Sequence, residues 1–223
     1  MKDSLFIIIS SLFACALLYI LTQQVEVNYL WQTLFKVFVF LLVPLFYYLK
    51  VRSLPIKKVF NFSIHPPSKI AWIFALTTFS IILIAYFTLG RFVDFNAIAN
   101  EMTSKSNITP SNFIFVGLYI TFGNSFLEEW FFRGFIFKNL LNFKYKRTAY
   151  VFSSILFAVY HISIFQTWFN PWLILLCLIA LFSVGLIFNW LNTKNAGFIN
   201  SWLVHIFADA AIIIVGLIMF NMI

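Results

Sequence analysis

The fold is decided by residues 112–137, which read NFIFVGLYITFGNSFLEEWFFRGFIF. A helix needs about 20 apolar residues to cross a bilayer, and this stretch is long enough to do so. It nevertheless contains two adjacent carboxylates, Glu128 and Glu129, and a guanidinium at Arg133. Charged side chains at membrane depth are costly and normally face a partner or a water-filled cavity. The stretch therefore predicts a membrane-spanning helix that carries part of a polar site.

The composition of the whole chain is that of a membrane protein. Hydrophobic residues make up 62% of its 223 residues and charged residues only 10%, against about 25% charged in soluble proteins. The formal net charge of +8 comes mostly from basic loops, so no nucleic-acid partner is expected. Cys15 and Cys177 lie in apolar runs without CxxC spacing. Neither a disulfide framework nor a thiolate metal site is therefore predicted.

Seven apolar segments can be marked along the chain, which predicts an all-α, polytopic transmembrane helix bundle of about seven spans and seven or eight helices. The first segment continues past any small-residue cleavage site, so we expect an uncleaved helix. Residues 1–111 are expected to form N-terminal helices and loops, and residues 112–223 a second bundle, within one integrated membrane domain. The segments are 5–21, 29–49, 70–89, 112–137, 148–165, 171–191 and 198–220.

Basic residues are concentrated in alternate loops. The loops after the second, fourth and sixth segments hold most of them, whereas the loop at 23–28 carries only Glu26 and the loop at 166–170 carries no charge. Because basic loops stay on the cytoplasmic side, the N-terminus is predicted to be cytoplasmic. We expect the membrane to be a bacterial plasma membrane. The basic loop residues are Lys50, Arg52, Lys57, Lys58, Lys69, Lys138, Lys144, Lys146, Arg147 and Lys194.

Two further apolar segments carry ionisable groups at a similar depth. His161 lies in segment 148–165, and His205 and Asp209 lie in segment 198–220. At a rise of about 1.5 Å per residue, these groups and Glu128 lie roughly 10–20 Å from the cytoplasmic ends of their helices. Agreement in depth among three helices that differ in direction predicts that the groups converge on one site.

Spacing within each segment supports a shared site. Glu129 and Arg133 are four residues apart, as are His205 and Asp209, so each pair shares a helix face. A carboxylate beside an imidazole can deprotonate and orient a water molecule, which is the basis of general-base hydrolysis. Taken alone, Glu129 with Arg133 is also consistent with a helix-stabilising pair, and His161 with a packing histidine. Their combination in one chain favours a functional site.

Three motifs follow one another on the late segments: EExxxR at 128–133, FxxxH at 157–161 and HxxxD at 205–209. The ordered set resembles the CPBP family of CAAX-processing and bacteriocin-processing proteins, also called the abortive-infection family. The similarity covers about residues 112–211. The resemblance implies an intramembrane endopeptidase, of a family whose eukaryotic members trim prenylated CAAX proteins.

The resemblance also implies a role for each motif residue. Glu128 is the base that activates the attacking water, with His161 as its partner. His205 and Asp209 form the oxyanion-stabilising side of the site. The supporting residues, which brace the helices or help to hold substrate, are Glu129, Arg133 and Phe157.

Asp209 departs from the family pattern, which often has Asn at this position. An Asn amide can donate a hydrogen bond to an oxyanion, whereas an ionised Asp cannot. Three roles therefore stay open for Asp209: a protonated donor, a group that orients His205, or a ligand.

The sequence leaves metal dependence open. Glu128, His161 and His205 form a plausible zinc set with a fourth position for water. However, HExxH spacing is absent, and a Glu–His pair can activate water without a metal. A zinc enzyme and a metal-free enzyme are both consistent with the chain.

The depth of the site indicates its substrate. A group buried below the membrane boundary is reached more readily by a hydrophobic or membrane-bound peptide than by a soluble protein. Trp130, Phe131 and Phe132 can line the path of such a peptide, but at least two of them are expected to face lipid.

Other functions fit the sequence less well. A rhomboid-like serine protease would need GxSG, and the nearest match is residues 123–126, Gly-Asn-Ser-Phe; an aspartyl type would need a second aspartate beside Asp209. A non-catalytic bacteriocin-immunity or regulatory protein on the same fold is the main alternative. A proton-coupled transporter is the third, because paired Glu and His also form proton relays.

Overall fold

The computed structural model describes residues 2–25, 27–56, 66–193 and 197–223. All regular secondary structure in these parts is helical, which confirms the predicted all-α bundle. The α-helices are α1 (Lys2–Gln23), α2 (Tyr29–Phe46), α4 (Lys69–Leu89), α5 (Phe95–Ser104), α6 (Phe113–Leu118), α7 (Ser125–Glu128), α8 (Lys138–Asn142), α9 (Lys146–Tyr160), α10 (Ile162–Phe165), α11 (Pro171–Thr193) and α12 (Ile199–Met219). Segment η2 (Gly90–Phe92) is a 3-10 helix, which is wound more tightly than an α-helix. The wider π-helices are η1 (Tyr47–Val51), η3 (Tyr119–Asn124) and η4 (Glu129–Phe137).

Within the described parts, six helical stretches are long and apolar enough to cross a bilayer. They correspond to six of the seven predicted segments, and their ends differ from the predicted ends by a few residues. The stretches are Lys2–Gln23, Tyr29–Val51, Lys69–Phe92, Lys146–Phe165, Pro171–Thr193 and Ile199–Met219.

The remaining predicted segment, residues 112–137, is helical but irregular. From residue 113 to residue 142 the chain runs through α6, η3, α7, η4 and α8 without leaving helical geometry, and it alternates between α and π winding. Single π turns inside helices are frequently found at functional sites. Glu128 and Glu129 lie at the junction between α7 and η4. We call residues 113–142 the irregular helix.

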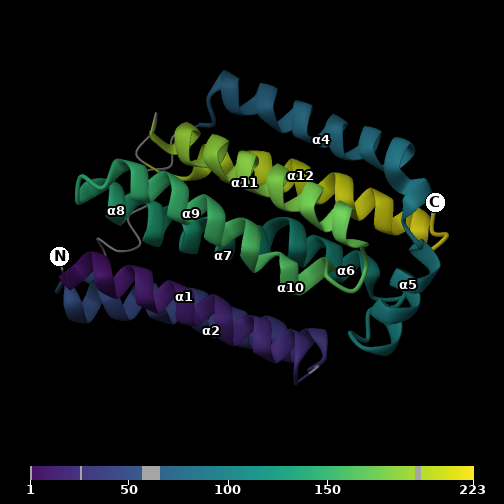
Figure 1. The fold of residues 1–223 in the computed structure, drawn as a ribbon, viewed down its shortest axis with the longest axis horizontal. Helices are drawn as coiled ribbons and strands as arrows, with labels where there is room; N and C mark the ends of the chain where they lie inside the picture. Colours follow the sequence, from purple (N-terminus) through teal and green to yellow (C-terminus); the bar gives the residue numbers. More distant parts are fainter. Residues whose placement is uncertain (1, 26, 57–65, 194–196) are drawn as a thin grey trace.

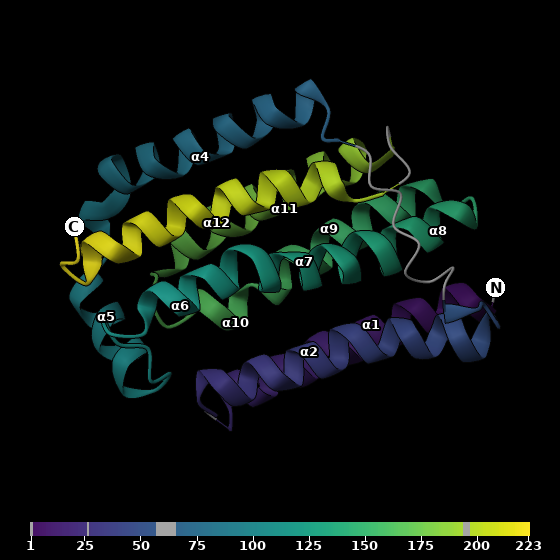
Figure 2. The same ribbon diagram turned by 180° about the vertical axis from the view of Figure 1, so that it is seen from behind.

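The long helices lie side by side along the long axis of the molecule (Figure 1). α1 and α2 form an antiparallel pair on one side, and α4 lies on the opposite side against α12 (Figures 1 and 2). The irregular helix runs between these two sides and contacts α2, α9 and α12. The acidic pair is therefore placed in the middle of the bundle.

An aromatic cluster packs α2 and α9 against the irregular helix. Phe40 stacks on Phe131 with ring centroids 4.1 Å apart, and Phe132 meets both Phe40 and Phe157 edge-on. Trp130, Phe131 and Phe132 are all buried. The expectation that at least two of these three face lipid was therefore wrong. This part of their helix lies inside the bundle, where the three side chains meet aromatic residues of α2, η1 and α9.

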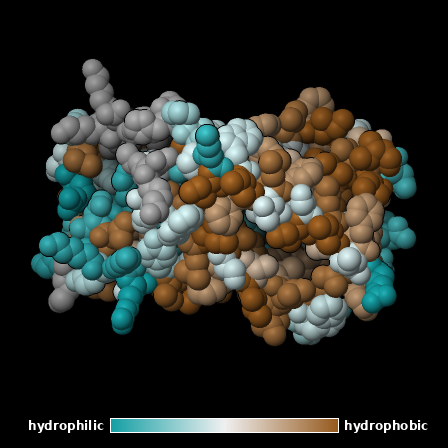
Figure 3. Space-filling model, turned by 90° about the horizontal axis from the view of Figure 1, so that it is seen from above, coloured by the Kyte–Doolittle hydropathy of each residue, from teal (hydrophilic) through white to brown (hydrophobic). Residues whose placement is uncertain are grey.

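The surface is apolar around the middle of the molecule and more polar towards its ends (Figure 3). Phe13, Phe87 and Phe115 expose 64%, 77% and 74% of their surfaces. Soluble monomers rarely expose apolar patches larger than a few hundred Å², whereas lipid covers such side chains in a membrane. The chain is therefore an integral membrane protein.

The described basic loop residues lie at one end of the bundle. This end contains the N-terminus, α8 and the start of α9 (Figure 1). Arg52, which follows η1, forms an ion pair with Asp3 of α1 there, with Nη1 and Oδ2 3.1 Å apart. The remaining residues used in the topology prediction lie outside the described residues: Glu26, Lys57, Lys58 and Lys194.

Candidate active site

The carboxylate of Glu128 is buried at the centre of the bundle, and its two oxygens have different surroundings. Oε1 accepts hydrogen bonds from Lys36 Nζ at 2.6 Å and from Asn124 Nδ2 at 2.9 Å. Tyr160 Oη lies 3.5 Å from the same oxygen. Oε2 is buried and has no hydrogen bond within the described residues. Glu128 therefore has one occupied oxygen and one oxygen open to a reacting group.

Two imidazoles face this second oxygen. His161 Nε2 lies 3.5 Å and His205 Nε2 lies 3.7 Å from Glu128 Oε2. The three side chains come from α7, from the break between α9 and α10, and from α12. The structure thus brings together three of the four groups for which the sequence predicted convergence.

The other ring nitrogen of each histidine is held in place. His161 Nδ1 lies 2.7 Å from the backbone carbonyl oxygen of Phe157, one helical turn earlier. His205 Nδ1 lies 3.0 Å from Glu129 Oε1. The ring of Phe157 packs edge-on against both imidazoles, with centroids 4.6 Å and 5.9 Å away. Because the Nδ1 atoms are occupied, both Nε2 atoms are directed to Glu128.

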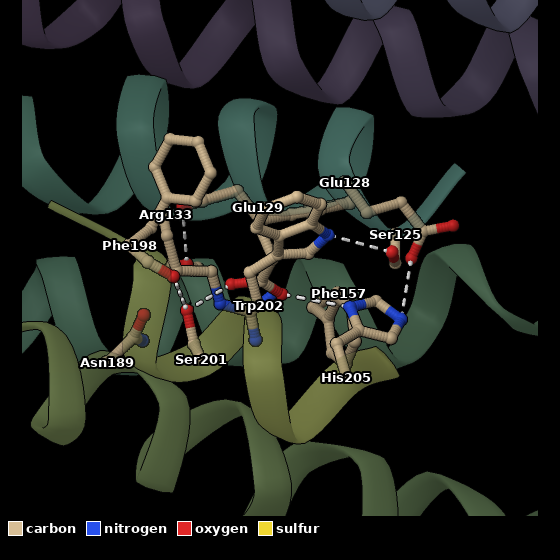
Figure 4. Close-up of polar contacts among 12 residues, drawn as sticks. Ser125, Glu128, Glu129, Arg133, Phe157, Asn189, Phe198, Ser201, Trp202 and His205 are labelled. Carbon is tan, nitrogen blue, oxygen red and sulfur yellow. Dashed lines mark hydrogen bonds and ion pairs between the residues drawn. The ribbon is translucent and has the colours of Figure 1, made fainter. Parts of the chain in front are cut away.

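Glu129 links the irregular helix to α12 (Figure 4). Its carboxylate pairs with Arg133, with Nη1 and Oε1 3.2 Å apart, and accepts a hydrogen bond from Ser201 Oγ. The guanidinium lies over the rings of Phe157 and Phe188, at 4.1 Å and 4.8 Å from their centroids. Both charged groups are fully buried. The predicted pair is thus part of the framework that orients His205.

Asp209 lies at the edge of this arrangement. Its Oδ1 is 3.9 Å from His205 Nε2, which is beyond hydrogen-bonding distance. Its Oδ2 is buried and has no hydrogen-bond partner among the described residues. Glu129, and not Asp209, therefore makes the contact that orients His205.

Two residues of the site were not predicted from the sequence. Lys36 of α2 contacts Glu128 directly, and its ammonium also donates a hydrogen bond to Asn124 Oδ1. The sequence does contain a signal for Lys36, because it is the lone charged residue inside apolar segment 29–49. Such charges normally have a functional partner. Asn124 could have been found one turn before Glu128 on the same helix.

The sequence left open whether Glu128, His161 and His205 form a zinc set, and their arrangement does not fit one. Among the parts of the chain that the structure describes, no group of three or more His, Cys, Asp or Glu side chains is arranged to hold a metal ion. One oxygen of Glu128 is already paired with an ammonium group, 2.6 Å away. A cation bound by Glu128 would have to share the carboxylate with this positive charge. The geometry favours acid–base chemistry carried out directly by the Glu128 carboxylate and the imidazoles of His161 and His205.

The region that contains this site is similar to a known protein family. Residues 110–211 match the family model described as Type II CAAX prenyl endopeptidase Rce1-like. The matched residues include Glu128, His161 and His205, whereas Lys36 lies outside the match. No curated protein and no solved structure matches the chain. Residues 110–211, slightly under half of the chain, are therefore similar to the Rce1-like CAAX prenyl endopeptidases of the CPBP family.

Proposed function

We propose that this protein is an intramembrane endopeptidase that hydrolyses peptide bonds in membrane-associated peptides or proteins. The family match supports a protease of this general type. One observation carries the mechanism: the buried Oε2 of Glu128 has no hydrogen bond among the described residues and faces the Nε2 atoms of His161 and His205. A carboxylate and two imidazoles directed at one point are suited to general acid–base catalysis.

In the proposed reaction, Glu128 Oε2 removes a proton from a water molecule, which attacks the carbonyl carbon of the scissile peptide bond. His161 holds the water through Nε2. The same carboxyl group then gives its proton to the leaving nitrogen as the carbon–nitrogen bond breaks. The products are a new carboxylate and a new amine, and no oxidant, reductant or metal enters the balance.

His205 is assigned to the developing oxyanion. Its Nε2 donates to the carbonyl oxygen as negative charge forms there, and the Glu129 carboxylate, 3.0 Å from Nδ1, stabilises the positive charge on the ring. Preorganised donors of this kind are often the largest single contribution to catalysis. We assign Asp209, whose Oδ2 has no hydrogen-bond partner among the described residues, to accept a backbone N–H of the bound peptide.

The proposed location is a bacterial plasma membrane, with the N-terminus and the basic end of the bundle in the cytoplasm. In this orientation the site lies roughly 10–20 Å below the cytoplasmic boundary. The proposed substrate is therefore an extended segment of a hydrophobic or membrane-bound peptide.

The proposal can be tested with the purified protein in lipid vesicles. We expect it to cleave a membrane-inserted hydrophobic peptide faster than unfolded soluble casein. Faster cleavage of casein would contradict the substrate class. Absence of cleavage with both substrates and a panel of membrane peptides would contradict the enzyme and favour a non-catalytic immunity or regulatory protein.

A further inference from the structure

Lys36 is a buried charge in a helix that otherwise has an apolar composition. It lies in α2, its side chain is 10% exposed, and its Nζ is 2.6 Å from Glu128 Oε1. The ammonium also lies 5.0 Å and 5.6 Å from the ring centroids of Tyr160 and Phe40. This group is therefore enclosed by one carboxylate, one amide and two aromatic faces.

A simple structural role does not account for this lysine. α2 is already attached to the irregular helix by the ring stack between Phe40 and Phe131 and by a hydrogen bond from Tyr48 Oη to the carbonyl oxygen of Gly134. Burying an ammonium group is costly, and apolar side chains of similar size often stabilise a protein as well as a buried ion pair does. The free-energy cost of burying Lys36 is better explained by its effect on Glu128.

The effect of Lys36 on Glu128 is geometric. Lys36 and Asn124 both donate to Oε1, and Lys36 also donates to the Asn124 side chain, so the three groups form a closed triangle. A carboxylate held at one oxygen by two donors cannot rotate without breaking both hydrogen bonds. Oε2 is then the oxygen that remains directed at His161 and His205.

We infer that Lys36 is a positioning residue that fixes the Glu128 carboxylate and reserves Oε2 for the reacting water. The inference rests on the proposed function. It also extends the active site beyond the family match at residues 110–211 to the N-terminal helix pair. α2 is then a part of the catalytic apparatus and not only a membrane anchor.

The first test separates turnover from binding. Lys36→Met should lower kcat on the order of 100-fold, because small displacements of a catalytic group have effects of this size, and should leave KM nearly unchanged. Lys36→Arg, which retains the positive charge, should recover part of the loss. Lys50→Met is the matched control, because Lys50 is an exposed lysine in η1, which continues α2, and it should turn over like wild type. Wild-type kcat in Lys36→Met would overturn the inference.

A second test does not need activity. The thermal stability of Lys36→Met, Glu128→Gln and the double variant forms a double-mutant cycle. We expect Lys36→Met to lower Tm less in the Glu128→Gln background, because that background has no carboxylate charge to leave unpaired. Equal losses in both backgrounds would overturn the pairing. Wild-type turnover by Glu128→Gln alone would contradict the proposed function, and the positioning role of Lys36 would fail with it. The double-mutant cycle would still show whether the two side chains interact.

Discussion

Glu129 Oε1 lies 3.0 Å from His205 Nδ1, so the second carboxylate of the acidic pair holds the imidazole that faces the first. Neighbouring residues on one helix thus act on the same histidine from two directions. Glu129 contacts one ring nitrogen, and Glu128 faces the other at 3.7 Å. Because consecutive residues point about 100° apart on a helix, this division between the two carboxylates follows from their adjacency.

Glu129→Gln should destabilise the protein and reduce its activity. The substitution leaves the buried Arg133 guanidinium without a charged partner, which typically costs about 3–5 kcal/mol, and it removes the charge beside His205. The free energy of unfolding can be measured in detergent by denaturant titration. Glu101→Gln is the matched control, because Glu101 pairs with Lys105 in the same i, i+4 spacing but at the surface, and it should cost about 1 kcal/mol or less. Equal losses in the two variants would contradict the bracing role of Glu129.

Metal chelators should leave turnover unchanged. The proposed reaction uses only Glu128 and the two histidines, and the described residues contain no group arranged to hold a metal ion. Cleavage of the membrane-inserted peptide should be measured before and after incubation with 1,10-phenanthroline and EDTA. Loss of activity that added Zn²⁺ restores would show that the zinc set considered from the sequence does operate.

Gly185→Leu should destabilise the bundle where α11 crosses α9. A Cβ atom at Gly185 would lie 3.1 Å from the backbone Cα of Ser154, which cannot move aside as a flexible side chain would. Overpacking of this kind costs roughly 1–3 kcal/mol, so Tm should fall. At Gly134 an added Cβ would meet its nearest neighbour, in Trp130, at an ordinary 3.5 Å, so Gly134→Ala should change Tm less. The reverse order would show that α9 and α11 do not approach closely at Gly185.

Reporter fusions should place the basic end of the bundle in the cytoplasm. A fusion after Lys58 or after Lys146 should read as cytoplasmic and one after Thr103 as external, because basic loops are retained on the cytoplasmic side. Paired alkaline phosphatase and fluorescent-protein fusions would measure both sides. An external signal from the Lys146 fusion would invert the bundle and move the site to the opposite leaflet.

The sequence predicted the three central groups because their positions follow from simple geometry. Glu128, His161 and His205 are polar residues within long apolar segments, and helical rise alone puts them at a similar depth. The order of the three motifs along the chain supported the same prediction, because it resembles that of the CPBP family. The same reasoning applied to segment 29–49 would have identified Lys36, whose charge stands out in the same way.

Other features of the structure could not be predicted from the sequence. The contact between Glu129 and His205 joins residues 76 positions apart, and no local pattern specifies it. In a membrane protein, apolar side chains face both lipid and core, so composition did not distinguish the buried Phe131 and Phe132 from lipid-facing residues. The π winding around the acidic pair depends on packing against neighbouring helices and leaves no periodic signal.

The central claim is that Glu128 Oε2 is the base that activates water. It is tested most directly by comparing the turnover of one membrane-inserted peptide by wild type and by Glu128→Gln, in vesicles that contain equal amounts of folded protein. Gln has nearly the same volume and keeps an oxygen for Lys36, so the variant should insert and fold. We predict that its turnover falls by on the order of 100- to 10,000-fold, the usual contribution of general acid–base catalysis. Turnover by Glu128→Gln at the wild-type rate would contradict the assignment.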